Sequence, residues 1–138
     1  MPLRLLGQRD DGRVATLPVR RAEARAVKGL IKQRFGEGWR EANWIVLGDL
    51  NAYRYGLGPL AERIDEGESG IEPLLDNFAI DPMETLPAHE RWTHFRRYWS
   101  EAREQLVETH MPLDHILLSP ALAAATPMRS MSSRPAAP

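Results

Sequence analysis

The chain has 138 residues, of which 43% are hydrophobic and 27% charged, with a net charge of −1 and no cysteine. This composition is typical of one folded domain and excludes a disordered chain. The lack of cysteine excludes a disulfide framework, a thiolate nucleophile and a metal site with thiolate ligands. The near-neutral charge gives no global basic field that would steer the chain to nucleic acid. We find no signal peptide and no apolar run of membrane-spanning length, so we expect a cytoplasmic chain without a membrane span.

Helical periodicity dominates the first third of the chain. Apolar residues recur at helical spacing from Val19 to Phe35, basic residues fill much of the remainder, and Gly36 ends the pattern. Residues 1–18 carry no such pattern and are expected to be irregular. The short apolar run Trp44–Leu47 contains two β-branched residues and predicts a buried strand.

The rest of the chain predicts short elements of both kinds. Strands are expected over 91–95 and 113–118, where aromatic and β-branched residues gather. Helical segments are expected over 59–64, 71–75, 98–109 and 119–122, a loop over 53–58, and a disordered tail from 126 onward. Helices interleaved with about three to five short strands indicate an α/β layered fold, with few strands for a sheet that must cover helices by itself.

Polar residues follow the first predicted strand in the segment VLGDLNA, residues 46–52. In extended chain, Asp49 and Asn51 would project together while Leu50 turns toward the core. The carboxylate can accept a proton from water or bind a divalent cation, and the carboxamide can donate to a phosphate oxygen. A turn in which both side chains cap nearby backbone amides explains the same residues, and spacing alone favours that second interpretation.

Three segments in order resemble one protein family. VLGDLNA resembles the G-D-x-N motif of the endonuclease/exonuclease/phosphatase superfamily, which consists of metal-dependent phosphodiesterases with a DNase I-like fold. RRAEARAVKGLI, which precedes it, is similar to the helix before the family's motif strand. ERWTHF followed by PLDHILLSPAL is similar to the family's later strand pair. Together these segments cover the chain from about residue 19 to residue 123.

The resemblance implies about half of a DNase I-like layered α/β sandwich, with a partial domain over 19–125. Residues 1–18 would be the remnant of a truncated domain, and 126–138 a disordered tail. The resemblance further implies that Asp49 orients or deprotonates the attacking water and binds Mg²⁺ or Mn²⁺. Asn51 would hold a phosphate oxygen of the substrate or help to seat the metal. Asp114 would buttress a catalytic histidine. The implied partner is a phosphate-ester substrate, nucleic acid among the candidates.

Parts of the family's site are missing from this sequence. It has no Q-E pair to supply the main metal-binding Glu, no N-x-H and no S-D-H to supply the catalytic histidine. None of the four histidines takes that place, and strand alternation points His115 away from Asp114. We therefore expect a truncated, catalytically impaired hydrolase whose uncovered faces are exposed and prone to association.

A non-catalytic module that binds phosphate or nucleic acid in the same cleft is the alternative. The candidate surface combines Arg96 and Arg97, beside Tyr98 and Trp99, with basic residues on the first predicted helix. Those helical residues are Arg20, Arg21, Arg25, Lys28 and Lys32. An unrelated α/β protein with a coincidental G-D-x-N would require three ordered matches to arise by chance.

Overall fold

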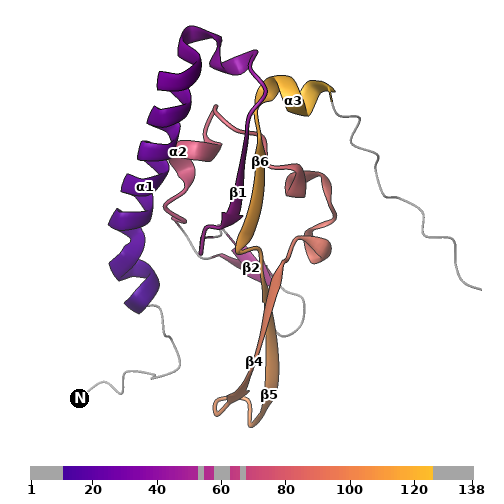
Figure 1. Ribbon diagram of the computed structural model, residues 1–138. Coiled ribbons are helices and arrows are strands. Elements are labelled where there is room, and N and C mark those ends of the chain that lie inside the picture. The colour runs from indigo at the N-terminus through magenta and orange to yellow at the C-terminus, as the bar shows by residue number, and fades with distance from the viewer. Residues whose placement is uncertain (1–10, 53–54, 58–62, 66–67, 126–138) are drawn as a thin grey trace, which may run out of the picture.

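The computed structural model describes residues 11–52, 55–57, 63–65 and 68–125. Helices and strands are mixed along these residues, so the α/β class is confirmed in its broad sense. The described residues form six strands, more than the three to five expected, and every strand pair among them is antiparallel. The strands form two sheets, one of two strands beneath a long helix and one that extends into a projecting hairpin (Figure 1).

The long helix α1, Asp11–Phe35, begins earlier than the sequence predicts. The expectation of irregular chain over 1–18 is therefore wrong from residue 11 onward, and residues 1–10 lie outside the described residues. Pro18 lies inside the helix and lacks the N–H needed for one backbone hydrogen bond, which lowers the stability of the helix at that turn. The helix nevertheless continues on both sides of Pro18, because its other turns keep their hydrogen bonds. The predicted end is confirmed. Gly36 has a φ of 59°, which suits the residue just after a helix, and the 3-10 turn η1, Gly36–Arg40, follows.

Strands β1, Ile45–Asp49, and β6, Asp114–Leu118, form the first sheet where two strands were predicted, but β1 is exposed on one face and is not the buried strand that was expected. They are antiparallel, with Val46 opposite Leu117 and Gly48 opposite His115. An isolated bridge from Ile80 to Leu118 continues the sheet on the other side of β6. After β6, helix α3, Pro120–Ala125, begins where a helical turn was predicted.

The core lies between α1 and one face of this sheet. Helix α2, Glu72–Leu75, confirms another prediction and packs against α1. Phe78, just after α2, stacks on Trp44 with ring centroids 5.1 Å apart and on Trp39 at 4.4 Å. The Trp44 indole donates to the Trp39 carbonyl at 2.8 Å, so its one polar atom is satisfied while the ring is buried.

The opposite face of the β1–β6 pair is uncovered among the described residues. Ile45, Leu47 and Ile116 point to that side, and 50%, 70% and 57% of their respective surfaces are exposed. Strand alternation explains the pattern, since the intervening residues of both strands face the core. The expected exposed apolar face is thus present on this sheet.

Most of the wrongly predicted elements belong to the second sheet. Its strand order is β3, Arg63–Asp65; β2, Tyr55–Leu57; β5, Gln105–Met111; and β4, His94–Ser100. The predicted loop over 53–58 is a strand at 55–57. The predicted helix over 59–64 is a strand at 63–64, and 59–62 lie outside the described residues. β3 pairs with β2, and β2 pairs in turn with the distant β5 through Leu57 and His110, a pairing that no local pattern reports.

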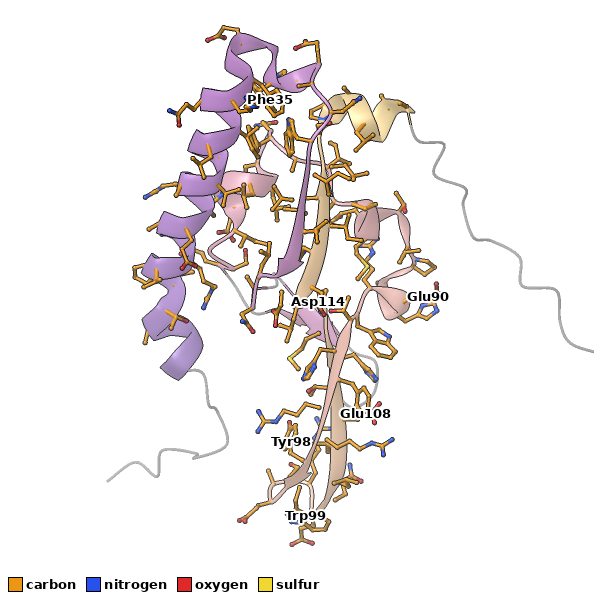
Figure 2. All side chains as sticks on the ribbon, viewed as in Figure 1. Phe35, Glu90, Tyr98, Trp99, Glu108 and Asp114 are labelled. Carbon is orange, nitrogen blue, oxygen red and sulfur yellow. The ribbon has the colours of Figure 1, made fainter. Side chains whose placement is uncertain are left out.

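The predicted helix over 98–109 is instead the hairpin made by β4 and β5, which we call the ribbon, residues 94–111. Seven residue pairs join the two strands. Glu104 has a φ of 49° in the turn between them, which reverses the chain where a helix would continue. The aromatic residues of β4 and the β-branched residues of β5 fit this arrangement. Figure 2 shows Tyr98 and Trp99 toward the far end of the ribbon and Asp114 near its base.

Two 3-10 turns connect the α2 region to the ribbon. They are η2, Pro82–Thr85, and η3, Ala88–Glu90. No helix among the described residues combines the length and the apolar composition needed to cross a bilayer.

Candidate functional site

The structure brings Asp49 and Asp114 together. They are directly opposite each other in the β1–β6 ladder, one at the end of β1 and the other at the start of β6. Directly opposed residues of an antiparallel pair share a face, with Cβ atoms about 4.5–5.5 Å apart. Both are exposed, on the same side as Leu47 and Ile116. Two of the three predicted site residues thus lie side by side, although 65 positions separate them in the sequence.

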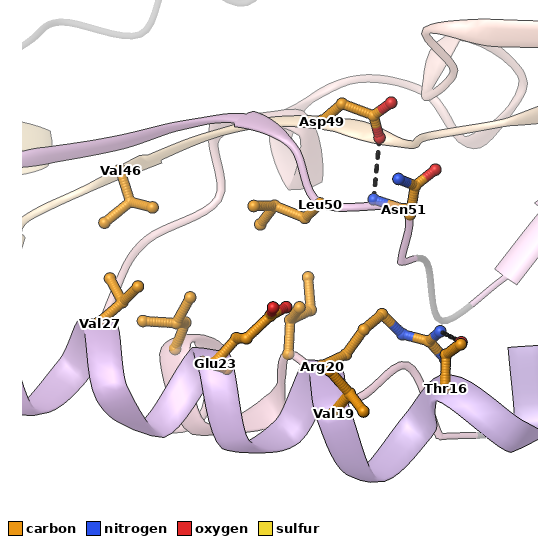
Figure 3. A pocket seen from close by; sticks show the side chains of 12 residues that line it. Thr16, Val19, Arg20, Glu23, Val27, Val46, Asp49, Leu50 and Asn51 are labelled. Atoms are coloured by element: carbon orange, nitrogen blue, oxygen red, sulfur yellow. Dashed lines mark hydrogen bonds between the residues drawn. The ribbon is translucent and has the colours of Figure 1, made fainter.

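Asn51 lies in a tight turn just beyond this pair. Asp49 Oδ1 accepts a hydrogen bond from the Asn51 backbone N–H at 2.9 Å, and Asn51 has a φ of 47° (Figure 3). Asn tolerates this left-handed conformation better than most residues. The capping interpretation is therefore right for Asp49. The Asn51 carboxamide has no hydrogen-bond partner among the described residues.

Backbone hydrogen bonds fix the turn and the start of β6 to each other. The Leu50 N–H donates to the Leu113 carbonyl at 3.0 Å. The hydroxyl oxygen of Thr93 accepts from the backbone N–H groups of both Leu113 and Asp114, at 3.1 and 3.0 Å. Thr93 belongs to the segment ERWTHF, and no local pattern predicts that its hydroxyl accepts from the Asp114 backbone.

His115 is buried behind the carboxylate pair, with 6% of its surface exposed. Its Nε2 lies 2.6 Å from the Ala52 carbonyl, and its Nδ1 lies 3.6 Å from Asp81 Oδ2, too far for a hydrogen bond. The ring faces away from the exposed side that Asp114 occupies, as strand alternation predicted. It therefore does not supply the missing catalytic histidine that Asp114 would hold.

The surroundings of His115 favour its charged form. Burial lowers the pKa of His115, but the Asp81 carboxylate, the Ala52 carbonyl and the charge of Asp114 together raise that pKa above its ordinary value. No motif in the sequence identifies Asp81 as a neighbour of His115. No local pattern could join these residues, because Asp81, Ala52 and β6 meet only through the tertiary fold.

The site offers too few ligands for a resident divalent cation. Among the described residues, no group of three or more Asp, Glu or His side chains is placed to hold a metal ion. Asp49 and Asp114 supply two carboxylates, whereas Mg²⁺ and its relatives require about six oxygen ligands. The described residues therefore fit a Mg²⁺ or Mn²⁺ centre only in part.

A cavity of about 480 Å³ lies on the other side of the turn, between α1 and β1. Its walls are apolar, with polar residues of α1 and the turn at its rim; it is lined by Thr16, Val19, Arg20, Glu23, Ala24, Val27, Val46, Asp49, Leu50, Asn51, Ile71 and Leu74. Figure 3 shows the Glu23 carboxylate reaching into the gap and the Asp49 carboxylate pointing away from α1. Asp49 and Asn51 therefore both lie at the edge of this cavity.

Several of the helical basic residues are engaged within the chain. The Arg20 side chain is buried and donates from Nε to the Ser69 carbonyl at 3.0 Å. Arg21 pairs with Glu68 at 2.7 Å, and Lys28 lies over the Phe78 ring at 4.9 Å. These contacts reduce the helical part of the predicted nucleic-acid surface.

The arginines of the ribbon point to opposite faces, because they are neighbours on one strand. Arg97 pairs with Glu108 at 2.6 Å, and this hydrogen bond is the main reason that the pKa of Glu108 is lowered. Arg96 lies over the Tyr98 ring at 5.6 Å and has no carboxylate partner among the described residues. The expected single surface is thus divided, with Arg96 and Tyr98 on one face and Arg97 and Trp99 on the other.

Comparisons of the chain with protein-family models, with curated proteins and with solved structures find no match.

Proposed function

We propose that the chain carries part of a phosphodiester or phosphomonoester hydrolase site of the endonuclease/exonuclease/phosphatase type, in a half DNase I-like sandwich. The observation that carries the proposal is the pairing of Asp49 with Asp114 beside the carboxamide of Asn51, which has no hydrogen-bond partner among the described residues. The resemblance of VLGDLNA and PLDHILLSPAL to family motifs assigns these same three residues to one site. An open apolar face on one side of the sheet and a helix on the other also fit half of a two-sheet sandwich.

Each of the three site residues would have a separate chemical role in hydrolysis. Asp49 uses one carboxylate oxygen to hold the turn, which leaves the other to accept a proton from an attacking water. The Asn51 carboxamide donates to a phosphate oxygen. Asp114 adds a second carboxylate that would orient a histidine, which these 138 residues do not provide in that position. A metal ion, when bound, would supply charge stabilisation for the phosphate. We propose that the chain by itself is catalytically impaired.

Manganese titration followed by NMR tests the site separately from turnover. With millimolar Mn²⁺ in ¹H–¹⁵N spectra, the backbone amides of Asp49, Asn51 and Asp114 should broaden first, because a bound paramagnetic ion relaxes nearby protons most. Asp49→Asn should reduce that broadening. The control Glu37→Gln removes an exposed carboxylate elsewhere and should change nothing at the site. Uniform broadening along the chain, or the same pattern in Asp49→Asn, would contradict the proposed site.

Hydrolysis of bis(p-nitrophenyl) phosphate with Mg²⁺ or Mn²⁺ tests the impairment. We expect no turnover above the Asp49→Ala variant, because the missing histidine and Glu each contribute orders of magnitude in rate to sites of this kind. Turnover by the wild-type chain that disappears in Asp49→Ala would show that the site is complete, and the impaired reading would be wrong.

A binding module for nucleic acid is the second candidate, and Arg96, which lies over the Tyr98 ring and has no carboxylate partner among the described residues, favours it. Base stacking on aromatic rings beside arginine is a common mode of single-strand binding, and it weakens with salt. Fluorescence anisotropy with a labelled oligonucleotide should detect salt-dependent binding that is lost when Arg96 and Arg97 are both changed to Glu. Arg34→Glu, on the last turn of α1, reverses a charge away from the ribbon and serves as the control for a general effect of charge reversal. Absence of binding at low ionic strength would exclude this candidate.

A further inference from the structure

The cavity between α1 and β1 has the size and the wall chemistry of a small-molecule site. Its volume is about 480 Å³, within the range of about 300–1,000 Å³ that is usual for ligand pockets. Its inner wall includes Ala24, Ile71 and Leu74, which are buried. Val27 and Val46 add half-buried apolar surface from α1 and β1, on opposite sides of the cavity (Figure 3). The interior therefore suits an apolar group.

The mouth of the cavity carries the carboxylate of Glu23. This residue lines the cavity and is exposed, so the cavity opens to solvent beside it. Figure 3 shows the Glu23 carboxylate directed from α1 into the gap between the helix and the turn after β1. After Asp11, Glu23 is the one acidic residue of α1, a helix otherwise rich in arginine and lysine. Its single carboxylate is thus placed where a ligand would enter.

No side chain of the helix pairs with this carboxylate. Residues three and four positions apart are neighbours on a helix. Both neighbours of Glu23 at four positions are valines, and the one basic neighbour at three positions is Arg20. The Arg20 guanidinium is turned away, because it donates to the Thr16 hydroxyl and to the Ser69 carbonyl (Figure 3). Glu23 has no hydrogen-bond or ion-pair partner among the described residues.

The charges around the cavity favour a cation over an anion. Three charged residues line it, Arg20, Glu23 and Asp49, so carboxylates outnumber guanidinium groups. Arg20 is buried and already donates to protein acceptors, whereas the Glu23 carboxylate faces the cavity. Asn51 also lines the cavity, and its carboxamide oxygen can accept from an ammonium N–H. A protonated amine therefore suits this mouth better than a carboxylate does.

We propose that this cavity binds a small molecule that has an apolar body and a protonated amine. The body packs among Ala24, Val27 and Leu74, and the ammonium group stays at the mouth, where it pairs with Glu23. This orientation buries apolar surface and leaves the charge in contact with water. Binding requires neither a metal ion nor a phosphate ester, so the site does not depend on the proposed hydrolase function.

Three compounds that share one apolar body test the site: 4-phenylbutylamine, 4-phenylbutanol and 4-phenylbutanoate. Each is titrated into the whole chain, and ¹H–¹⁵N spectra report its affinity and its location. The amine should bind about threefold or more tightly than the alcohol, as expected for a partly exposed ion pair, and the carboxylate should bind most weakly. The backbone amides of Glu23, Val27, Val46 and Leu50 should shift most, whereas those of the ribbon should not respond.

Glu23→Gln keeps the size of the side chain and removes its charge. The amine should then bind about threefold more weakly, at the level of the alcohol, and the affinity for the alcohol should stay the same. Glu37→Gln removes an exposed carboxylate from η1 and is the matched control, which should change neither affinity. Val27→Phe should fill the cavity and weaken binding of all three compounds. If that variant does not fold, the compound series and Glu23→Gln still decide.

Equal affinities for the amine and the alcohol, tighter binding of the carboxylate, or unchanged amine binding in Glu23→Gln would overturn the proposal. The same holds if the largest amide shifts lie outside the cavity, or if the amine does not bind at millimolar concentration. Such a result would leave the proposed hydrolase site standing, because manganese broadening at Asp49 and Asp114 is measured without these compounds.

Discussion

Asp49 and Asp114 are paired residues at the last position of the β1–β6 ladder, so two carboxylates meet at one end of an otherwise apolar sheet face. Directly opposed like charges destabilise an antiparallel pair. Replacing either carboxylate with a neutral residue would therefore stabilise the fold. The presence of both supports a functional role more strongly than either carboxylate alone.

Asp114→Asn should therefore increase the free energy of unfolding at pH 7 by about 0.2–1 kcal/mol, because it removes the repulsion from Asp49. Both side chains are exposed, so the gain should shrink in 1 M salt, where the screening length is about 3 Å. Urea denaturation at low and high salt measures both effects. A loss of stability in Asp114→Asn, or a gain that salt leaves unchanged, would contradict the repulsion.

The local elements of the fold could be predicted from the sequence. Apolar periodicity identified most of α1, and short apolar runs identified β1 and β6, because burial of one face leaves a regular pattern in the chain. The ribbon was mistaken for a helix over 98–109, because its charged residues have good helix propensity. Pairing between β4 and β5 overrides that propensity.

The candidate site could be predicted in its residues but not in its geometry. Asp49, Asn51 and Asp114 were identified from motifs, and the register that places Asp49 opposite Asp114 is a tertiary property. The contacts of His115 with Ala52 and Asp81 are also tertiary, and the family motifs contain no counterpart that could indicate them.

The uncovered sheet face should promote self-association. Leu47→Lys places a charge at the centre of the exposed face made by Ile45, Leu47 and Ile116. This substitution should weaken self-association at least tenfold, because burial of one leucine side chain contributes at least that much to the association constant. Sedimentation velocity over a concentration series measures the change. Leu30→Lys is the matched control, because Leu30 is comparably exposed on α1, away from this face. Equal association in the two variants would show that the face is not responsible.

Glu72 should stabilise the start of α2 in a pH-dependent way. Its carboxylate accepts from the backbone N–H groups of Ser69 and Gly70, at 2.7 and 2.8 Å, and from the Ser69 hydroxyl. Burial raises the pKa of Glu72, but these hydrogen bonds outweigh burial and leave the pKa below its ordinary value. The stabilisation is therefore complete above about pH 4.3, the unfolded value, and is lost as the pH falls through the lower folded pKa.

Glu72→Ala should cost about 1 kcal/mol at neutral pH, the usual order of a hydrogen-bonded side chain's net contribution to stability. The difference from wild type should shrink at acid pH, as the wild-type carboxyl is protonated. Thermal unfolding from pH 2 to pH 7 measures this, with Glu37→Ala as the control for an exposed carboxylate. A constant difference at all pH values would mean that packing, not the charge, explains the loss.

His115 should act on stability at the opposite end of the pH range. A pKa raised in the folded state contributes stability that is complete below the unfolded value of about 6.5 and is lost as the pH rises through the folded pKa. The melting temperature of the wild type should therefore fall on going from pH 6 to pH 9. Asp81→Asn should flatten this slope, because the carboxylate that favours the imidazolium is gone. Differential scanning calorimetry provides the comparison, and a slope as steep in Asp81→Asn as in the wild type would assign the pH dependence to another group.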